Sequence, residues 1–362
     1  MTGDHKKKEE ASGYFPTRKK WTYGLPKELA AEAAYPKNAL VELTNGCNHA
    51  CLFCKNADQN RKAGTLSLDK FTSFVSQAAA LGLEEMGLYT TGEPFLTKNL
   101  DLYVKVAKDA GLRRVYVTTN GALATVDRVR KCYESGLDSI KFSINASNAA
   151  DYKLVHGVDD FQKVIRNLDE IFAWKTSSGA SLQLLCSCVM IPAVGDIKEE
   201  HRKVFGKYFE DMQYIHANSQ GGQAFDLVDE LGVSPHGVFS DLAKEAKASD
   251  VKPCSMLWNR YHLTAEGYLT ACCVDYELNL VFADLADQSV ADAWNNTVMR
   301  KLRTAHIDND MGGLLCHQCL YNKKAPYSSV MDVQKSQKSA ASRAKEKEEL
   351  RERIASANPD RE

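Results

Sequence analysis

Apolar runs of strand length alternate with longer amphipathic stretches between residue 39 and about residue 217. The apolar runs predict strands at Ala39–Leu43, Met86–Thr90, Arg114–Thr118, Ser139–Ile144, Leu182–Ile191 and Tyr214–Ala217. Apolar positions at helical spacing predict helices near Leu68–Leu81, Leu100–Ala110, Val126–Ser135, Asp160–Thr176 and Lys198–Phe209. Strands that alternate with helices pair in parallel through right-handed crossovers. Because a full barrel needs eight such units, the six found here predict an α/β fold with a partial (β/α)6 TIM-like barrel.

Regions of different composition flank this repeating part. We expect a polar tail and lead-in over residues 1–36, the barrel over 37–220, a linker over 221–252 and a cysteine-rich domain over 253–324. Short strands at Tyr261–Thr264 and Tyr268–Thr270 and a helix near Val290–His306 are predicted in that last domain. The charged tail over 325–362 has few large apolar residues after Gln334, which predicts a solvated helix or a disordered segment.

Composition removes several classes of protein. Lys plus Arg total 46 and Asp plus Glu total 47 among 362 residues, so the chain lacks the basic footprint of a nucleic-acid binder. No apolar run is long enough to span a bilayer, and the N-terminus lacks the apolar core of a signal peptide. We therefore expect a cytoplasmic protein, in which eleven cysteines indicate metal binding rather than disulfides.

Cys47, Cys51 and Cys54 lie in a short loop directly after the first predicted strand. In parallel α/β proteins such a loop lies at the carboxyl edge of the sheet, where ligands bind. Thiolates select iron–sulfur clusters or zinc, and a closed site of either kind takes four protein ligands. Three cysteines would leave one iron open to a ligand. The alternative is a zinc site completed by His49 or a distant residue.

The Cys-x3-Cys-x2-Cys spacing, with Phe53 before the last cysteine, resembles the signature loop of the radical S-adenosylmethionine (radical SAM) enzymes. In that family the three cysteines hold a [4Fe–4S] cluster whose fourth iron binds S-adenosylmethionine. An electron from the cluster then yields a 5′-deoxyadenosyl radical that abstracts hydrogen from the substrate. The resemblance implies a flavodoxin- or ferredoxin-type reductant as partner.

Three further elements at predicted strand ends resemble places where this family contacts S-adenosylmethionine. They are Thr91-Gly92-Glu93-Pro94, Thr118-Thr119-Asn120-Gly121 and Ser143-Ile144-Asn145. The resemblance implies that the cofactor is bound by Phe53, Gly92, Glu93, Pro94, Thr119, Asn120, Ser143 and Asn145. Many relatives have Arg-Gly after the fourth strand, where this chain has His156-Gly157.

The later cysteines, together with Trp294-Asn295 ahead of the final Cys-x2-Cys, resemble the SPASM/twitch extension of the same family. The resemblance implies one auxiliary [4Fe–4S] cluster, with ligands Cys254, Cys272, Cys316 and Cys319. Two alternatives stay open, namely Cys273 in place of Cys272 and zinc in place of the cluster.

Two side chains are candidates for catalysis. Asp275 resembles the carboxylate base of anaerobic sulfatase-maturing relatives, and the alternative is a structural Asp. Cys186 and Cys188 alternate along one strand and so share a face. If that face is the barrel lumen, Cys188 could return hydrogen to a substrate radical, as in radical epimerases; otherwise both are core thiols.

The favoured hypothesis is a radical SAM enzyme that oxidises or rearranges a sugar-like or cyclitol metabolite. It rests on the spacing of Cys254, Cys272, Cys316 and Cys319, which is similar to that of an amino-cyclitol dehydrogenase in the family. A peptide- or protein-modifying enzyme is the alternative, although the segment before Ala39 is short for a peptide-recognition domain. A radical epimerase and a non-catalytic Fe–S or zinc scaffold are the remaining possibilities.

Overall fold

The structure is a computed structural model that describes residues 26–224 and 251–357. Most of the N-terminal tail and of the linker expected at 221–252 lies outside these described residues. Within them, nine strands form one sheet in the order β6-β5-β4-β3-β2-β1-β7-β8-β9. The strands are β1 (Asn38–Val41), β2 (Glu85–Gly87), β3 (Arg114–Thr119), β4 (Ser139–Ser143), β5 (Gln183–Met190), β6 (Asp211–His216), β7 (Arg260–Leu263), β8 (Tyr268–Thr270) and β9 (Val281–Asp284).

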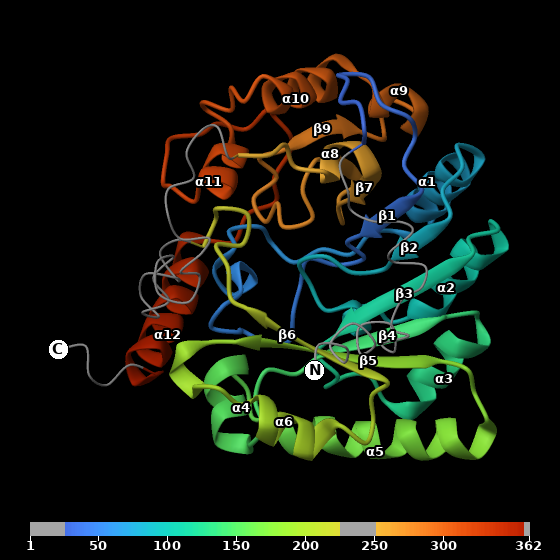
Figure 1. Ribbon diagram of the computed structural model, residues 1–362, viewed down its shortest axis with the longest axis vertical. Helices are drawn as coiled ribbons and strands as arrows, with labels where there is room; N and C mark the ends of the chain where they lie inside the picture. Colours follow the sequence, from blue (N-terminus) through green and yellow to red (C-terminus); the bar gives the residue numbers. More distant parts are fainter. Residues whose placement is uncertain (1–25, 225–250, 358–362) are drawn as a thin grey trace, which may run out of the picture.

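Strands β1 to β6 pair in parallel, each with the next, and helices cover the outer face of this curved sheet (Figure 1). These helices are α1 (Leu68–Ala80), α2 (Leu100–Asp109), α3 (Val126–Glu134), α4 (Ala149–His156), α5 (Phe161–Ser178) and α6 (Lys198–Phe205). The predicted partial (β/α)6 barrel is confirmed. The core lies between the sheet and the helices, because alternate residues of each strand face outward. On β3, for example, Val115 and Val117 are buried in this core, whereas Tyr116 and Thr118 are partly exposed on the inner face.

The helices differ from the predicted ones in two places, and local capping residues explain both differences. Helix α4 is absent from the predicted elements; it begins where the Asn148 side chain accepts the backbone N–H of Asp151 and ends at Gly157, whose φ is +75°. The single helix expected near Val290–His306 is two helices, α9 (Val290–Trp294) and α10 (Thr297–Ile307). They separate at Asn296, whose side chain caps the N-terminus of α10.

The cysteine-rich segment continues the barrel sheet. Strand β7 pairs in parallel with β1 along its whole length, and β8 and β9 follow in antiparallel order. The same segment holds the lead-in before β1, since the indole N–H groups of Trp258 and Trp294 donate to the carbonyls of Ala30 and Ala34. Besides α8 (Met256–Asn259), its helices include α11 (Leu315–Tyr321), which carries the last two cysteines.

The charged C-terminal region forms helix α12 (Ala340–Ala357), which lies against the first cysteine loop (Figure 1). Leu350 is only 5% exposed and packs with Leu52 and Val155. The segment is therefore a mostly exposed helix, in keeping with the solvated helix that was one of the two predictions for this tail, and Leu350 fastens it to the barrel. No helix among the described residues combines the length and apolar character required to cross a membrane.

Candidate functional site

The first cysteine loop runs from the end of β1 to the short helix η1 (Lys55–Asp58) at the carboxyl edge of the barrel sheet. Backbone bonds tie it to the end of α4, from Ala50 N to His156 O at 3.0 Å and from Leu52 N to Val155 O at 2.9 Å. Cys47, Cys51 and Cys54 are all free thiols at partly buried positions. The structure therefore brings the three predicted ligands together on one anchored loop.

Without a metal, the three thiols of this loop stay protonated near pH 7. Burial raises the pKa of the Cys47 thiol to about 12 and also raises the pKa of Cys54. Burial and the nearby Cys54 and Cys47 sulfurs raise the pKa of Cys51 well above its usual value. Thiols that resist ionisation together become thiolates when a metal replaces their protons. Three such sulfur donors fit the three-cysteine set expected for a [4Fe–4S] cluster.

Glu93, which follows β2, is hydrogen-bonded to residues at the end of β3, beside this loop. Its carboxylate accepts hydrogen bonds from Thr119 Oγ1 at 2.7 Å, from Asn120 N at 2.8 Å and from Phe95 N at 3.0 Å. The Asn120 side chain in turn donates to Asn48 Oδ1 at 2.9 Å, within the cysteine loop. Glu93, Thr119 and Asn120, which belong to two separate motifs, therefore form one network with that loop.

Position 92 needs a glycine, because its backbone passes very close to the backbone of the cysteine loop. A Cβ atom at this position would lie 2.1 Å from the Thr44 carbonyl oxygen and 2.5 Å from that of Gly46. The next residue donates its backbone N–H to Gly46 O at 2.9 Å, and Pro94 begins the short helix η2 (Pro94–Leu96). Phe53 is partly buried against the apolar cluster around Leu52.

Ser143 and Asn145 lie together at the end of β4. Ser143 is partly exposed on the inner face of the sheet, in register with Ser187 of β5 and, through it, with Gln213 of β6. Asn145 is buried, and its Oδ1 accepts the backbone N–H of Val189 at 2.7 Å. Contact of any of these residues with a cofactor stays a prediction.

His156 departs from the family pattern in the sequence, and the structure places it beside the cysteine loop. His49, Cys51 and His156 each offer a ligand atom within 4.8 Å of those of the other two. Burial lowers the pKa of both histidines, so both rings are neutral near pH 7. No sequence signal pairs these residues, because the pairing depends on how α4, which was not predicted, packs against the loop.

The five later cysteines also gather in space. The Cys272–Cys273 hydrogen bond raises the pKa of Cys272 and lowers that of Cys273. After burial, the charges of Cys254 and Cys319 are the next causes that raise the pKa of Cys316, and Cys254 and Cys273 act in the same way on Cys319. Four of the five thiols suffice for a closed cluster. The choice between Cys272 and Cys273 as ligand stays open.

The two candidate catalytic residues, Asp275 and Cys188, are both buried and in contact with groups of the protein itself. The Asp275 carboxylate is buried and accepts from Thr270 Oγ1 and from the backbone N–H groups of Asn279 and Leu280, all within 2.8 Å. Cys188 packs with Met190 and Ile197 on the outer face of the sheet, which α6 covers. The role of hydrogen donor requires the lumen face, so this placement argues against it.

Tyr276 connects the two groups of cysteines, a link with no sequence signal. Its hydroxyl oxygen lies 3.5 Å from Cys54 Sγ and donates to Gln220 Oε1 at 2.8 Å. The loop that contains Gln220 continues to Gly222, which lies against Gln318 and Cys319 of α11. The first loop, the loop after β6 and the later cysteines are therefore in direct contact.

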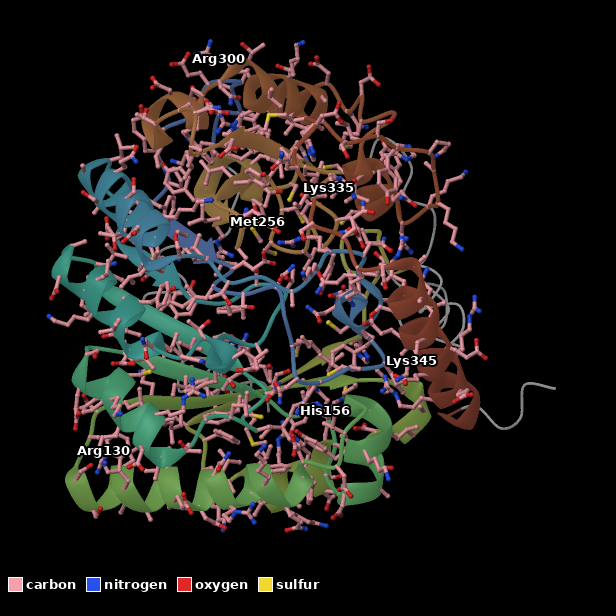
Figure 2. All side chains as sticks on the ribbon, turned by 180° about the vertical axis from the view of Figure 1, so that it is seen from behind. Arg130, His156, Met256, Arg300, Lys335 and Lys345 are labelled. Carbon is pink, nitrogen blue, oxygen red and sulfur yellow. The ribbon has the colours of Figure 1, made fainter. Side chains whose placement is uncertain are left out.

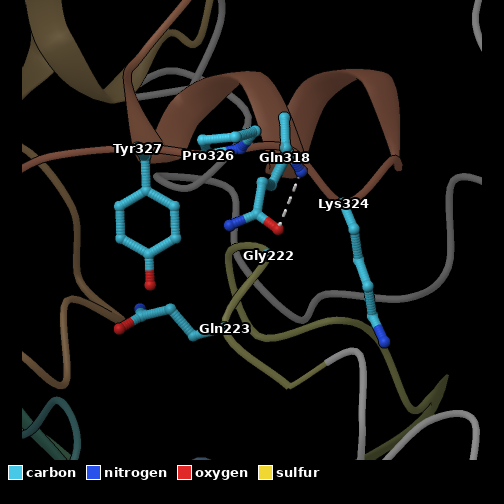
Figure 3. A pocket seen from close by; sticks show the side chains of 7 residues that line it. Gly222, Gln223, Gln318, Lys324, Pro326 and Tyr327 are labelled. Carbon is cyan, nitrogen blue, oxygen red and sulfur yellow. Dashed lines mark hydrogen bonds between the residues drawn. The ribbon is translucent and has the colours of Figure 1, made fainter.

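A cavity of about 400 Å³ opens beside the later cysteines, between the loop after β6 and α11 (Figure 3). Its walls include Gln223, Gln318, Lys324 and Tyr327. Figure 3 shows the Tyr327 hydroxyl and the Gln223 amide pointing toward one another across it. The lining is therefore mostly polar and rich in hydrogen-bonding groups.

Known proteins resemble this chain in two segments. Residues 41–175 match the radical SAM superfamily, whose members are enzymes that use S-adenosylmethionine, and residues 254–320 match the SPASM iron–sulfur cluster-binding domain. A probable GTP 3′,8-cyclase of Sulfolobus acidocaldarius is 30% identical over 130 residues, which are 36% of this chain and 41% of that protein. The chain thus spans about two fifths of the length of the curated relatives it matches.

Solved structures share the fold at low identity. Streptococcus suis SuiB bound to precursor peptide SuiA aligns with 83% of this chain and 76% of its own, at 12% identity and a TM-score of 0.57. Native anSMEcpe with bound AdoMet aligns with 90% of this chain and 100% of its own, at 13% identity and a TM-score of 0.55. The chain belongs to the radical SAM superfamily and carries a C-terminal SPASM domain.

Proposed function

We propose that this chain reductively cleaves S-adenosylmethionine and abstracts a hydrogen atom from a small, polar substrate. The observation that carries the proposal is the network in which Glu93, Thr119 and Asn120 meet the three-cysteine loop. A structural metal site needs only its ligands, whereas this chain also brings two polar strand ends to the same loop.

The chain's own residues have distinct roles in this proposal. Cys47, Cys51 and Cys54 hold a [4Fe–4S] cluster, and four of the later cysteines hold a second one. When bound, the first cluster and S-adenosylmethionine supply a 5′-deoxyadenosyl radical. Glu93 fixes the backbone of Asn120, and Gly92 lets the second strand end pass close to the loop. These contacts fix the second and third strand ends, which are the proposed cofactor-binding residues, before any substrate binds.

The lining of the cavity supports a small, polar substrate such as a sugar-like or cyclitol metabolite. Amide and hydroxyl groups from Gln223, Gln318 and Tyr327 can hydrogen-bond to a polyol. The row Ser143, Ser187 and Gln213 on the inner face of the barrel offers similar groups. A second cluster held by the later cysteines, next to this cavity, would accept the electron that the substrate radical loses when it is oxidised.

Cleavage of the cofactor is tested by anaerobic reconstitution with iron and sulfide, followed by a 5′-deoxyadenosine assay under dithionite. We expect 5′-deoxyadenosine from the unmodified chain and none from Cys54→Ala. Cys132→Ala is the matched control, because Cys132 is buried in the main core and belongs to neither group of cysteines. Absence of product from a chain that contains both clusters would overturn the proposal.

The substrate class is tested by transfer of deuterium into 5′-deoxyadenosine. Transfer from a carbon-deuterated sugar or aminocyclitol supports the proposal. Transfer only from a deuterated peptide would replace it with the peptide-modifying alternative.

A further inference from the structure

His156 connects the first cysteine loop to the end of β4 through both nitrogens of its ring. Its Nε2 lies 3.1 Å from the backbone nitrogen of Asn145, and its Nδ1 lies 3.5 Å from Cys51 Sγ. The residue ends α4 and is 1% exposed, and Figure 2 marks its place in the lower half of the molecule. Tyr152, one turn earlier, stacks on the ring with centroids 4.0 Å apart.

These contacts determine which nitrogen carries the proton. A backbone N–H can only donate, so the N–H of Asn145 requires Nε2 of His156 to be an acceptor. A neutral imidazole with an acceptor at Nε2 carries its proton on Nδ1. The Nδ1–H group therefore faces the cysteine loop.

Two acceptors compete for this proton. Nδ1 of His49 lies 3.2 Å away, and Nε2 of His49 is 3.5 Å from a carboxylate oxygen of Asp160. With its proton on Nε2, the nitrogen nearer to Asp160, a neutral His49 has Nδ1 as an acceptor. A ligating Cys51 is a thiolate, and hydrogen bonds to charged acceptors are roughly twice as strong as neutral ones. Cys51 Sγ is therefore the preferred acceptor once a metal centre is bound.

We propose that Nδ1–H of His156 donates a hydrogen bond to the Cys51 sulfur and thereby raises the reduction potential of the cluster held by Cys47, Cys51 and Cys54. The inference rests on the proposed function, because it assumes that cluster. Hydrogen bonds to cluster sulfurs are among the factors that set the potentials of Fe–S centres, since they stabilise the more negative, reduced state. His156 is a positioning residue in this account and touches no substrate.

The test is a redox titration of the reconstituted chain, followed by electron paramagnetic resonance (EPR) of the reduced first cluster. His156→Phe removes the donor and keeps a ring to stack on Tyr152. We expect it to make the first cluster about tenfold harder to reduce, a shift of about 59 mV to lower potential for a one-electron couple. His156→Asn, whose amide can replace Nδ1–H, should lie closer to the unmodified chain. Tyr152→Phe is the matched control and should leave the potential unchanged, because the Tyr152 hydroxyl has no hydrogen-bond partner among the described residues.

A second measurement detects the hydrogen bond itself. After exchange into D2O, pulsed EPR should detect a deuteron coupled to the first cluster that is lost in His156→Phe and retained in Tyr276→Phe, a comparison that is needed because the Tyr276 hydroxyl also lies near a cluster sulfur. No such coupling, or equal potentials in the unmodified chain and His156→Phe, would overturn the inference while cofactor cleavage still supports the proposed function. Stoichiometric zinc at His49, Cys51 and His156 with no reducible cluster would overturn both.

Discussion

The hydroxyl oxygen of Tyr276 lies 3.5 Å from Sγ of Cys54, so a residue of the SPASM segment touches the cysteine loop of the barrel. The two positions are 222 residues apart in the chain. The contact is possible because β7 extends the sheet next to β1 and brings the later cysteines over the carboxyl edge of the barrel. The two groups of cysteines therefore form one structural unit.

Tyr276→Phe should weaken the contact between the SPASM segment and the first cysteine loop without unfolding the protein. The variant loses the hydroxyl that lies against Cys54 and donates to Gln220. Because a typical hydrogen bond contributes about 0.5–1.5 kcal/mol, we expect iron to leave the first site roughly 2- to 10-fold faster under a chelator. Tyr103→Phe, which removes a buried hydrogen bond to the Leu66 carbonyl on the helix side of the barrel, is the control and should not change this rate. Equal rates for all three proteins would show that the contact with Cys54 stabilises nothing.

Gly92→Ala should disturb the close contact between the second strand end and the cysteine loop. The added methyl group would meet the carbonyl oxygens of Thr44 and Gly46, and backbone atoms cannot move aside as a flexible side chain can. We expect a loss of about 1–3 kcal/mol in the free energy of unfolding and weaker binding of S-adenosylmethionine, measured by denaturant titration and calorimetry. Gly64→Ala has open space around its Cβ position and should match the unmodified chain in both measurements.

Helix α12 should protect the first cysteine loop. Leu350→Ala removes most of the apolar side chain that packs on Leu52 and Val155. We expect α12 to detach, with faster proteolysis after residue 339 and faster loss of iron in air. Lys345→Ala, at a position whose side chain is 78% exposed, is the control. Iron retention in Leu350→Ala equal to that of the control would indicate that α12 does not shield the loop.

His201 should contribute to acid sensitivity. Burial lowers its pKa from 6.5 to about 4, and its ring nitrogens contact Tyr214 Oη and the Ile144 carbonyl. Because the folded-state pKa is lowered, the stabilising contribution is complete above about pH 6.5 and is lost as the pH falls through about 4. His201→Gln should reduce the slope of unfolding free energy against pH in this window, by up to about 1.4 kcal/mol per pH unit. His216→Gln, at an exposed strand end, is the control; the same slope in both variants would contradict the assignment.

Strong periodicity and motif order predicted much of this molecule. The six barrel strands lie within a few residues of the apolar runs, because each strand has a face buried under helices. The three strand-end motifs lie near the cysteine loop because parallel strands bring their carboxyl ends to one edge. Thr119 and Asn120 illustrate this, since both bond to Glu93.

Features that depend on packing could not be read from the sequence. The 8-residue helix α4 has a weak amphipathic pattern and is defined by Asn148 and Gly157 at its ends. The contact between His156 and Cys51 depends on that helix, so the sequence does not predict it either. Leu350 is an isolated apolar residue in a charged stretch of sequence, and only the tertiary structure reveals its partners.

We propose that the three cysteines leave one iron site free for S-adenosylmethionine. This site is tested by pulsed EPR of the reduced first cluster, with cofactor labelled by 15N at its methionine amino group. We expect a 15N coupling that appears on addition of the labelled cofactor and is absent in Cys54→Ala. A first cluster whose fourth iron is already bound by a nitrogen or sulfur of the chain, with no coupling to the added cofactor, would contradict it.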